Sequence, residues 1–191
     1  MEKYLQSTET VDWKNSGIIS KAKELAGGLT AHTHIARACF LWVRDHIRHI
    51  GDYNISEVSV TASDVLRSGS GVCYAKSHLL AALLRANSIP AGFCYQRLSR
   101  DENGAPFCLH GLNAVYLPET GWYRIDPRGN REDVNAQFNP PEEHLAFSVH
   151  IEGEIDFPDI LSAPHPVVIE ALKKYNTKDE LWDNLPDLNS M

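Results

Sequence analysis

The fold of this chain is decided by the stretch Gly69-Ser70-Gly71-Val72-Cys73-Tyr74 and by the apolar run that follows it, Ala75 to Ala86. The two glycines and the serine form a flexible approach, and the serine can cap a helix. Beyond them, apolar residues recur with a helical period until Asn87-Ser88-Ile89-Pro90 ends the pattern. The sequence therefore predicts a helix from about Cys73 to Ala86.

More than half of the circumference of this helix is apolar, which is typical of a core helix. At about 100° per residue, one sector holds the residues Ala75, Leu79, Leu80, Ala82, Leu83, Leu84 and Ala86 and extends to Cys73, whereas Tyr74, Ser77, His78 and Arg85 share the other side. Cys73 falls in the first turn, where unpaired N–H groups and the helix dipole favour a thiolate. This position suits a nucleophile, although an isolated cysteine in an apolar pattern is commonly a small buried hydrophobe.

Composition and charge favour one domain with a sizeable core. The chain has 191 residues, of which 43% are hydrophobic, and its 18 basic and 25 acidic residues give a net charge of -7. This charge disfavours nucleic acid and anionic membranes as partners. No apolar stretch approaches the roughly 20 residues of a membrane span, and residues 1–13 lack the pattern of a signal peptide. We therefore expect a cytoplasmic protein.

Cysteine and histidine spacing does not favour a metal site or a disulfide framework. The cysteines lie far apart at positions 39, 73, 94 and 108, with no C-x-x-C pair. A zinc site that uses Cys73, Cys108 and His110 matches none of the usual ligand spacings. The histidines at positions 32, 34, 46 and 49 have no carboxylate or third ligand placed near them, so we expect solvated or capping side chains. We expect no metal and no cofactor.

The remaining elements are short. Helices are expected at about 17–26, 31–48 and 61–66, strands at 91–98, 110–117 and 122–126, and two C-terminal helices at 167–175 and 179–184. The first dozen residues favour an edge strand or an ordered arm, and the stretch before Pro166 has no clear period. We predict a single domain over residues 1–191, with a catalytic core at about 31–130 and a C-terminal extension, 131–191, that packs on the core.

The strand residues His110 and Asp126 meet only if the loop between their strands has the right length. Side chains alternate faces along a strand, so a loop of three or five residues around Pro118-Glu119-Thr120-Gly121 places both on one face, whereas four residues separate them. Gly121 suits the left-handed position that a three-residue loop requires. If the two side chains act together in catalysis, the loop is expected to have an odd number of residues or to contain an equivalent bulge.

Cys73, His110 and Asp126 together have the residue types that a thiol nucleophile needs. The imidazole takes the thiol proton and later protonates the leaving group, while the carboxylate fixes the tautomer and supports the imidazolium. In general, a helix-start thiol paired with a protonated histidine has a pKa of roughly 3.5 to 7.5. Such a pair reacts at neutral pH.

The sequence resembles the transglutaminase-like superfamily, a papain-like group of thiol acyl-transfer enzymes. The resemblance rests on three blocks in this order: Gly71-Val72-Cys73 with residues 77–86 and 89–92, then residues 110–117, then residues 121–127. Residues 42–48, which precede these blocks, also resemble a helix of the family. It covers about residues 35–130. The resemblance implies an α+β fold with a papain-like or transglutaminase-like core, in which the nucleophile helix packs on an antiparallel β-sheet.

By the same resemblance, the catalytic cysteine, histidine and aspartate of the family are Cys73, His110 and Asp126. Members form a thioester and cross-link or deamidate glutamine, cleave peptide or other amide bonds, or act as N-acetyltransferases or glycan amidases. The chain is too short for the extra β-domains of animal transglutaminases and has no calcium-loop motif, so calcium dependence is not implied.

Other residues near these motifs have weaker indications. The backbone N–H of Cys73 is one expected oxyanion donor, and Trp42, Asn54 and Gln96 are side-chain candidates for the second. Tyr74 and Trp42 are candidate substrate-binding residues, although packing explains each of them as well. Lys76 is expected to reach out from the helix or to pair with an acid, and His78 to lie at the surface or behind the site. Arg128 and Asn130 order the site loop or cap a turn.

Two hypotheses follow for the function. In the first, a transglutaminase-like cysteine acyltransferase or hydrolase (a peptidase or amidase) attacks an amide carbonyl in a peptide, protein or small amide, and water or an amine accepts the acyl group. The sequence does not separate hydrolysis from amine transfer, because the acceptor is chosen by the shape of a cleft. In the second, the chain is a non-catalytic binding module that retains the fold.

Overall fold

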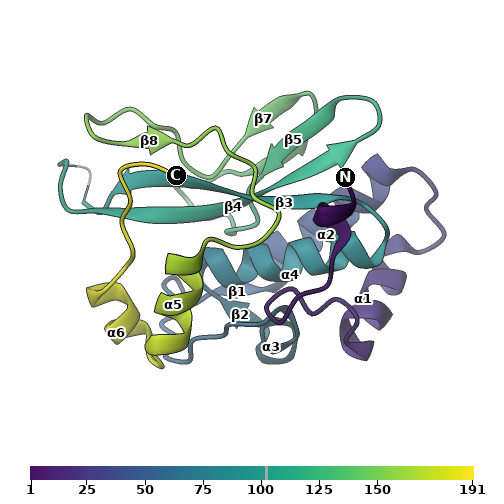
Figure 1. Ribbon diagram of the computed structural model, residues 1–191, viewed down its shortest axis with the longest axis horizontal. Helices are drawn as coiled ribbons and strands as arrows, with labels where there is room; N and C mark the ends of the chain where they lie inside the picture. The colour runs from purple at the N-terminus through teal and green to yellow at the C-terminus, as the bar shows by residue number, and fades with distance from the viewer. Residues whose placement is uncertain (102) are drawn as a thin grey trace.

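The computed structural model describes residues 1–101 and 103–191 and places helices against one side of an antiparallel sheet (Figure 1). The N-terminal elements are η1 (Glu2–Leu5), α1 (Ser16–Ala26), α2 (His32–His46), β1 (Arg48–His49) and α3 (Ala62–Ser68), and β2 (Ser70–Gly71) leads into α4 (Cys73–Ala86). The predicted helix from Cys73 to Ala86 is confirmed. The first residues form a 3-10 helix and not an edge strand.

The sheet has the strand order β5-β4-β3-β8, and its neighbours are antiparallel. Its members are β3 (Ala91–Ser99), β4 (Phe107–Leu117), β5 (Gly121–Ile125) and β8 (Ile155–Asp156). A short parallel pair joins β1 to β2, and β6 (Gln137–Asn139) pairs with β7 (Glu142–His144). The chain ends with α5 (Pro166–Lys174) and α6 (Lys178–Asp183). The α+β fold class and the helix packed on an antiparallel sheet are therefore confirmed.

Local sequence explains where the central elements begin and end. Thr61 and Asp64 form a capping box that starts α3, and Gly69 ends it in the left-handed conformation with φ +66°. The β4–β5 hairpin pairs Leu117 with Gly121, which leaves three residues in the loop, and Gly121 has φ +78°. The predicted odd loop and the role of Gly121 are confirmed.

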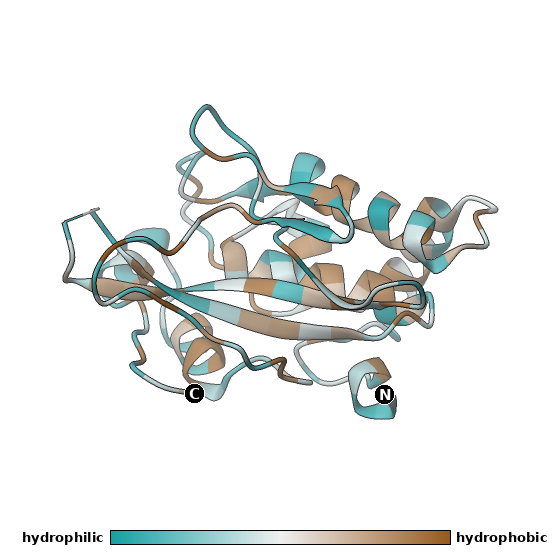
Figure 2. Cartoon of the chain, turned by 90° about the horizontal axis from the view of Figure 1, so that it is seen from above, coloured by the Kyte–Doolittle hydropathy of each residue, from teal (hydrophilic) through white to brown (hydrophobic). Residues whose placement is uncertain are grey.

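Helix α4 is the centre of the core. Every residue from Cys73 to Arg85 is buried, because α1, α2 and α3 pack around the helix and β3 and β4 cover its remaining side. The predicted core helix is confirmed, and Tyr74, Ser77, His78 and Arg85, on the side opposite the apolar sector, are enclosed as well. Arg85 shows how this is tolerated, since its guanidinium donates to the carbonyls of Gln6, Ala91 and Ser162. Figure 2, seen from above, shows apolar segments along the two long strands and the helices behind them, with hydrophilic segments between them.

The stretch without a clear period contains strands that its sequence did not indicate. β8 extends the sheet beside β3, and Leu161 pairs with Phe93 further along the same strand edge. Residues after 130 thus cover the free edge of β3. Among the described residues, no helix is long and apolar enough to cross a membrane.

Candidate active site

Cys73 is held at the first position of α4 by the elements before it. Ser70 and Gly71 pair with Arg48 and His49 in the short parallel β2–β1 ladder, which fixes the backbone just before the helix. A Cβ at Gly71 would lie 3.2 Å from the Cβ of Ala75, so glycine lets the chain turn tightly into α4. Cys73 is 7% exposed, and its exposed part lines a cleft. The thiol is therefore enclosed but reachable.

His110 is placed beside this helix start by β4. The hydroxyl of Tyr74 donates to the carbonyl of Leu109, and a Cβ at Gly111 would lie 2.7 Å from the Tyr74 ring. The two strand residues that flank His110 thus contact the residue that follows Cys73. Pairing with β5 stops at Asn113, where β5 ends at Ile125, so the part of β4 that holds His110 is open to other contacts.

Asp126 follows β5 and is fully buried against His110. Its Oδ2 lies 2.7 Å from Nε2 of His110, and its two oxygens also accept the backbone N–H groups of Arg128 and Ala146, at 3.0 and 3.1 Å. His110 and Asp126 therefore lie on one face, as expected for a three-residue loop. Because Asp126 occupies Nε2, Nδ1 is the ring nitrogen left for the thiol.

These contacts shift the proton affinities of both groups in opposite directions. Burial opposes a charged imidazole, but the negative charge of Asp126 and the charge and hydrogen bonds of the Cys73 and Asp126 side chains raise the pKa of His110 to about 10. Burial also opposes the Asp126 carboxylate, but His110 and the two backbone N–H donors lower its pKa overall. The pair therefore favours imidazolium beside carboxylate.

A second layer of side chains supports this pair. The ring of Phe147 meets the His110 ring edge-on, with centroids 5.0 Å apart, and the Arg128 guanidinium lies 5.8 Å from the Phe147 centroid. The same guanidinium makes two bonds to the Asp52 carboxylate, at 2.6 and 2.9 Å. Arg128 therefore holds Asp126 through its backbone and Asp52 through its side chain, which is the loop-ordering role considered for it.

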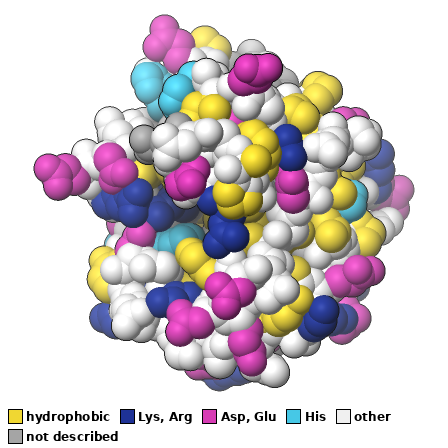
Figure 3. Space-filling view, turned by 90° about the vertical axis from the view of Figure 1, so that its left-hand side faces the viewer, with side chains coloured by type: hydrophobic (Ala, Val, Ile, Leu, Met, Phe, Trp, Pro, Cys, Tyr) yellow, Lys and Arg dark blue, Asp and Glu magenta, His cyan; other side chains and the backbone are white. Residues whose placement is uncertain are grey.

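The thiol and the imidazole line a cleft of about 630 Å³. Its walls come from the end of β1 and the loop after it, the start of α4, the end of β3, the start of β4, the segment 146–151 and α6, and they include Asp52, Cys108, Arg128, Arg131 and Trp182. Figure 3 faces the end of the molecule where α6 and the β3–β4 turn lie, and it shows acidic and basic side chains side by side with a histidine recessed among them. The cleft is large enough for part of a peptide or for a small amide.

Residues 19–127 match the family model of the transglutaminase-like superfamily. The chain belongs to this superfamily. Membership supports thiol-dependent catalysis as the general class of chemistry, and it fits the Cys73, His110 and Asp126 cluster just described. No curated protein matches the sequence.

One solved structure shows the same fold, and a second is similar to a lesser degree. A proposed cysteine protease from Cytophaga hutchinsonii superposes with a TM-score of 0.52 at 21% identity, over 65% of this chain and 40% of that one. The periplasmic domain of TgpA from Pseudomonas aeruginosa gives a TM-score of 0.48 at 22% identity, over 65% and 45% of the two chains. This transglutaminase-like chain thus spans less than half the length of both.

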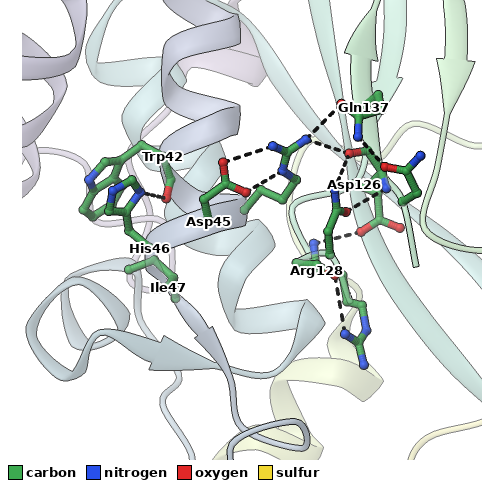
Figure 4. Close-up of polar contacts among 12 residues, drawn as sticks. Trp42, Asp45, His46, Ile47, Asp126, Arg128 and Gln137 are labelled. Carbon is green, nitrogen blue, oxygen red and sulfur yellow. Dashed lines mark hydrogen bonds and ion pairs between the residues drawn. The ribbon is translucent and has the colours of Figure 1, made fainter. Parts of the chain in front are cut away.

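The other predicted site residues lie in different places. Tyr74 lines the cleft, but its hydroxyl is committed to Leu109, so it packs the helix onto β4. Trp42 lies on α2, where it stacks on His46 and lines a separate groove. Figure 4 shows Trp42 and His46 well to one side of Asp126. The suggestion that Trp42 binds substrate beside Cys73 is therefore not supported by its position.

The two remaining side-chain candidates for the oxyanion site also lie outside the cleft lining. Asn54 accepts a hydrogen bond from Lys178 at the surface. Gln96 is buried on β3 opposite His110, and its amide donates to the carbonyl of Phe147. Gln96 therefore supports the segment that carries Phe147.

Three expectations for polar residues were wrong, and the reason is the same for each. Lys76 neither reaches solvent nor pairs with an acid: it is fully buried, and its ammonium donates to the carbonyls of Arg44 and Ile47 at the end of α2. His78 is buried and bonds the carbonyl of Val60 at 2.8 Å. His49 is buried in the cleft and not solvated. In each case neighbouring elements enclose the side chain, which neither a helical wheel nor the spacing of the residues can show.

The sequence also left Asp52, Phe147 and His49 without a site role. His49 lies just before a loop that the periodicity did not describe, and Asp52 lies within that loop. Phe147 lies in the stretch without a clear period. Arg128, two residues after Asp126, was the one signal, and the structure pairs its guanidinium with the Asp52 carboxylate.

Proposed function

We propose that this protein is a thiol acyltransferase or hydrolase that attacks an amide carbonyl with Cys73. The observation that carries the proposal is the His110 ring, which is hydrogen-bonded to a fully buried Asp126 and interacts with the Cys73 thiol at the wall of a cleft. Burying an imidazolium is costly unless a partner compensates its charge. A histidine with a purely structural role avoids this cost by staying neutral, so a buried charged pair at the wall of a cleft favours a catalytic role.

The first half-reaction starts from a Cys73 thiolate beside a His110 imidazolium, in which the proton of Cys73 already lies on Nδ1 of His110. The sulfur then forms a bond to the carbonyl carbon, and the π electron pair moves to the carbonyl oxygen. When this intermediate collapses, the C–N bond breaks and the amine leaves with the proton from His110. Asp126 keeps the ring oriented and supports its charge throughout. The product is a thioester on Cys73.

In the second half-reaction, a water molecule or an amine attacks the thioester and gives its proton to His110. The S–C bond breaks, and the thiolate and imidazolium are restored. Water would make the protein a peptidase or amidase, and an amine would make it a transglutaminase. The proposed donors are peptides, proteins or small amides. The cytoplasmic location stays a prediction.

Alkylation of Cys73 tests this proposal against a non-catalytic binding module. Iodoacetamide reacts with the thiolate, so an active site predicts fast labelling of Cys73 at pH 6, loss of that speed on unfolding, and slow labelling in His110→Ala. Cys39 and Cys94 provide internal controls, since burial raises the pKa of each thiol to about 12. Labelling of Cys73 that is as slow as that of an unfolded thiol at every pH would favour the binding module.

A further inference from the structure

A second histidine lies in the cleft and has no role in the steps above. His49 belongs to β1 and pairs with Gly71 of β2, two residues before Cys73. The N–H of Ile50 donates to the carbonyl of Gly71 at 3.2 Å, which continues the ladder. The backbone of His49 is thus tied directly to the backbone that presents the nucleophile.

The imidazole of His49 has unused hydrogen-bonding capacity. Its side chain is 7% exposed and lines the same cleft as Cys73 and His110. Nδ1 is buried and makes no hydrogen bond within the described part of the chain, and Oδ2 of Asp52 is too distant at 3.9 Å. Since Nδ1 is buried, the exposed part of the ring lies elsewhere, along the edges that include Nε2. An uncommitted buried imidazole is uncommon unless a ligand uses it.

The surroundings of His49 keep it uncharged. Burial and the nearby Arg128 lower the pKa of His49 to about 3, in spite of the Asp52 carboxylate. A neutral imidazole carries one N–H, and no bond fixes this proton on Nδ1. The ring can therefore present an N–H dipole from Nε2 without a positive charge that would compete with His110 for the thiolate.

Packing alone does not explain a histidine at this position. The ring meets Trp182 edge-on with centroids 6.2 Å apart, and a Cβ at Gly51 would lie 2.9 Å from the Trp182 ring. These contacts fill the wall tightly, but a phenyl ring would make them without leaving a buried nitrogen unpaired. Packing therefore does not explain the presence of the two ring nitrogens of His49.

The attack by Cys73 on a carbonyl requires hydrogen-bond donors for the carbonyl oxygen, and His49 can supply one. Negative charge develops on the carbonyl oxygen, and such sites place two donors around it. The backbone N–H of Cys73 is free to be one, because the first turn of a helix has no acceptors for its N–H groups. Several other donors that line the cleft are already used: Tyr74 by Leu109, Arg128 by Asp52, and Arg100 by the carbonyl of Trp182.

We propose that His49 is a catalytic residue that donates a hydrogen bond from Nε2 to the substrate carbonyl oxygen, beside the N–H of Cys73. This inference rests on the proposed function, because it assigns the oxyanion donor of the same reaction. It also explains why the β1–β2 ladder immediately precedes the nucleophile: the ladder holds the donor and the attacking sulfur in one register.

Two reactions of the same thiol separate this role from a structural one. Acylation by p-nitrophenyl acetate passes through an oxyanion, whereas alkylation by iodoacetamide replaces iodide at a saturated carbon and forms none. Removing one oxyanion donor typically slows acyl transfer about 10²- to 10³-fold. We therefore expect His49→Phe to slow acylation by that factor and to leave the alkylation rate within about threefold. His49→Gln, which retains an N–H near Nε2, should recover at least about tenfold of the acylation rate.

Each outcome decides between roles. Equal losses of acylation and alkylation in His49→Phe would overturn the proposal and make His49 a support for the thiol. An unchanged acylation rate, or His49→Gln no faster than His49→Phe, would also overturn it. If His49→Phe does not fold, His49→Leu replaces it in the same comparison, with circular dichroism as the check. Absence of both reactions at Cys73 in the unmodified protein would instead contradict the proposed function, with Cys73→Ala as the blank.

Discussion

Two of the histidines that line the cleft, His49 and His110, each lie close to an aspartate, and the two pairs are built differently. His110 and Asp126 share a hydrogen bond of 2.7 Å, and the acid is further held by two backbone N–H groups. His49 and Asp52 are 3.9 Å apart, and Asp52 is bound by Arg128 instead. Arg128 contacts both acids, so it couples the two regions.

This difference assigns the two rings different protonation states. The pKa of His110 is raised to about 10, because Asp126 and Cys73 outweigh its burial. The pKa of His49 is lowered to about 3, because burial and Arg128 outweigh Asp52. One ring can thus hold and transfer a proton at neutral pH, whereas the other can only donate a hydrogen bond as a neutral group. The two pairs contain the same residue types. Their roles differ because Asp126 hydrogen-bonds its histidine, whereas Asp52 binds Arg128 instead.

The largest expected effect comes from removing the first ring. His110→Ala should slow acylation of Cys73 by about 10⁴-fold or more, because the thiol loses its base and the leaving group loses its acid. His49→Phe, the matched change in the second pair, should cost clearly less. Stopped-flow release of p-nitrophenol measures both. Equal losses in the two variants would remove the functional distinction between the rings.

The two acids should differ in the same order. Asp126→Asn should slow acylation by about 10³- to 10⁴-fold, since the amide no longer supports an imidazolium and favours the wrong tautomer. Asp52→Asn should change it less than about tenfold, because Asp52 does not hydrogen-bond its histidine. The same kinetic assay applies. A larger loss in Asp52→Asn than in Asp126→Asn would contradict our assignment of the acids.

The coupling through Arg128 predicts a loss of stability with a small loss of activity. Arg128→Met removes the guanidinium but keeps the backbone N–H that holds Asp126. The side chains of Arg128 and Asp52 are only 8% and 19% exposed, so unfolding should become easier by about 1–3 kcal/mol. A urea-unfolding cycle with Asp52→Asn measures the coupling energy. Additive effects of the two substitutions would show that the ion pair contributes nothing.

The smallest expected effect is a pH dependence that is hidden in the unmodified protein. The pKa of His110 is raised to about 10, so its stabilisation is complete below about 6.5 and is lost as pH rises. Burial lowers the pKa of Lys76 to about 7, so the unfolded chain binds more protons there and this contribution to stability rises with pH. Between pH 7 and 8 the two slopes, each about 1 kcal/mol per pH unit, oppose each other.

Substitution should reveal each slope separately. Lys76→Met should make stability fall from pH 7 to 8, and His110→Phe should make it rise. Chemical denaturation at both pH values measures the slopes, with Lys23→Met on the exposed surface of α1 as the matched control. Parallel slopes in all three variants would contradict the protonation states assigned to His110 and Lys76.

The sequence predicted what local periodicity and hairpin geometry determine. Helix α4 followed from residue spacing, whereas spacing left the parity of the β4–β5 loop open, and the chemistry of His110 with Asp126 together with Gly121 favoured the odd loop that the structure has. Lys76 and His78 were misjudged, since the Lys76 ammonium and Nδ1 of His78 bond backbone carbonyls of distant segments. Those carbonyls are supplied by the fold and have no signature in the sequence.

Similar limits explain the missed part of the candidate site. The significance of His49 depends on a two-residue parallel ladder with Gly71, which is too short to have a period. Phe147 reaches His110 from a segment whose pattern is interrupted by prolines. Trp42 was one of several candidates, and α2 directs it into another groove.

The central claim is that Cys73 accepts an acyl group with the help of His110 and Asp126. Mass spectrometry of the protein after brief exposure to p-nitrophenyl acetate tests it most directly. We predict one acetyl group, located on the peptide that contains Cys73, that forms rapidly at pH 7, decays on addition of an amine and is missing in His110→Ala. An acetyl group that forms equally fast on Cys108, or on Cys73 without His110, would contradict the account.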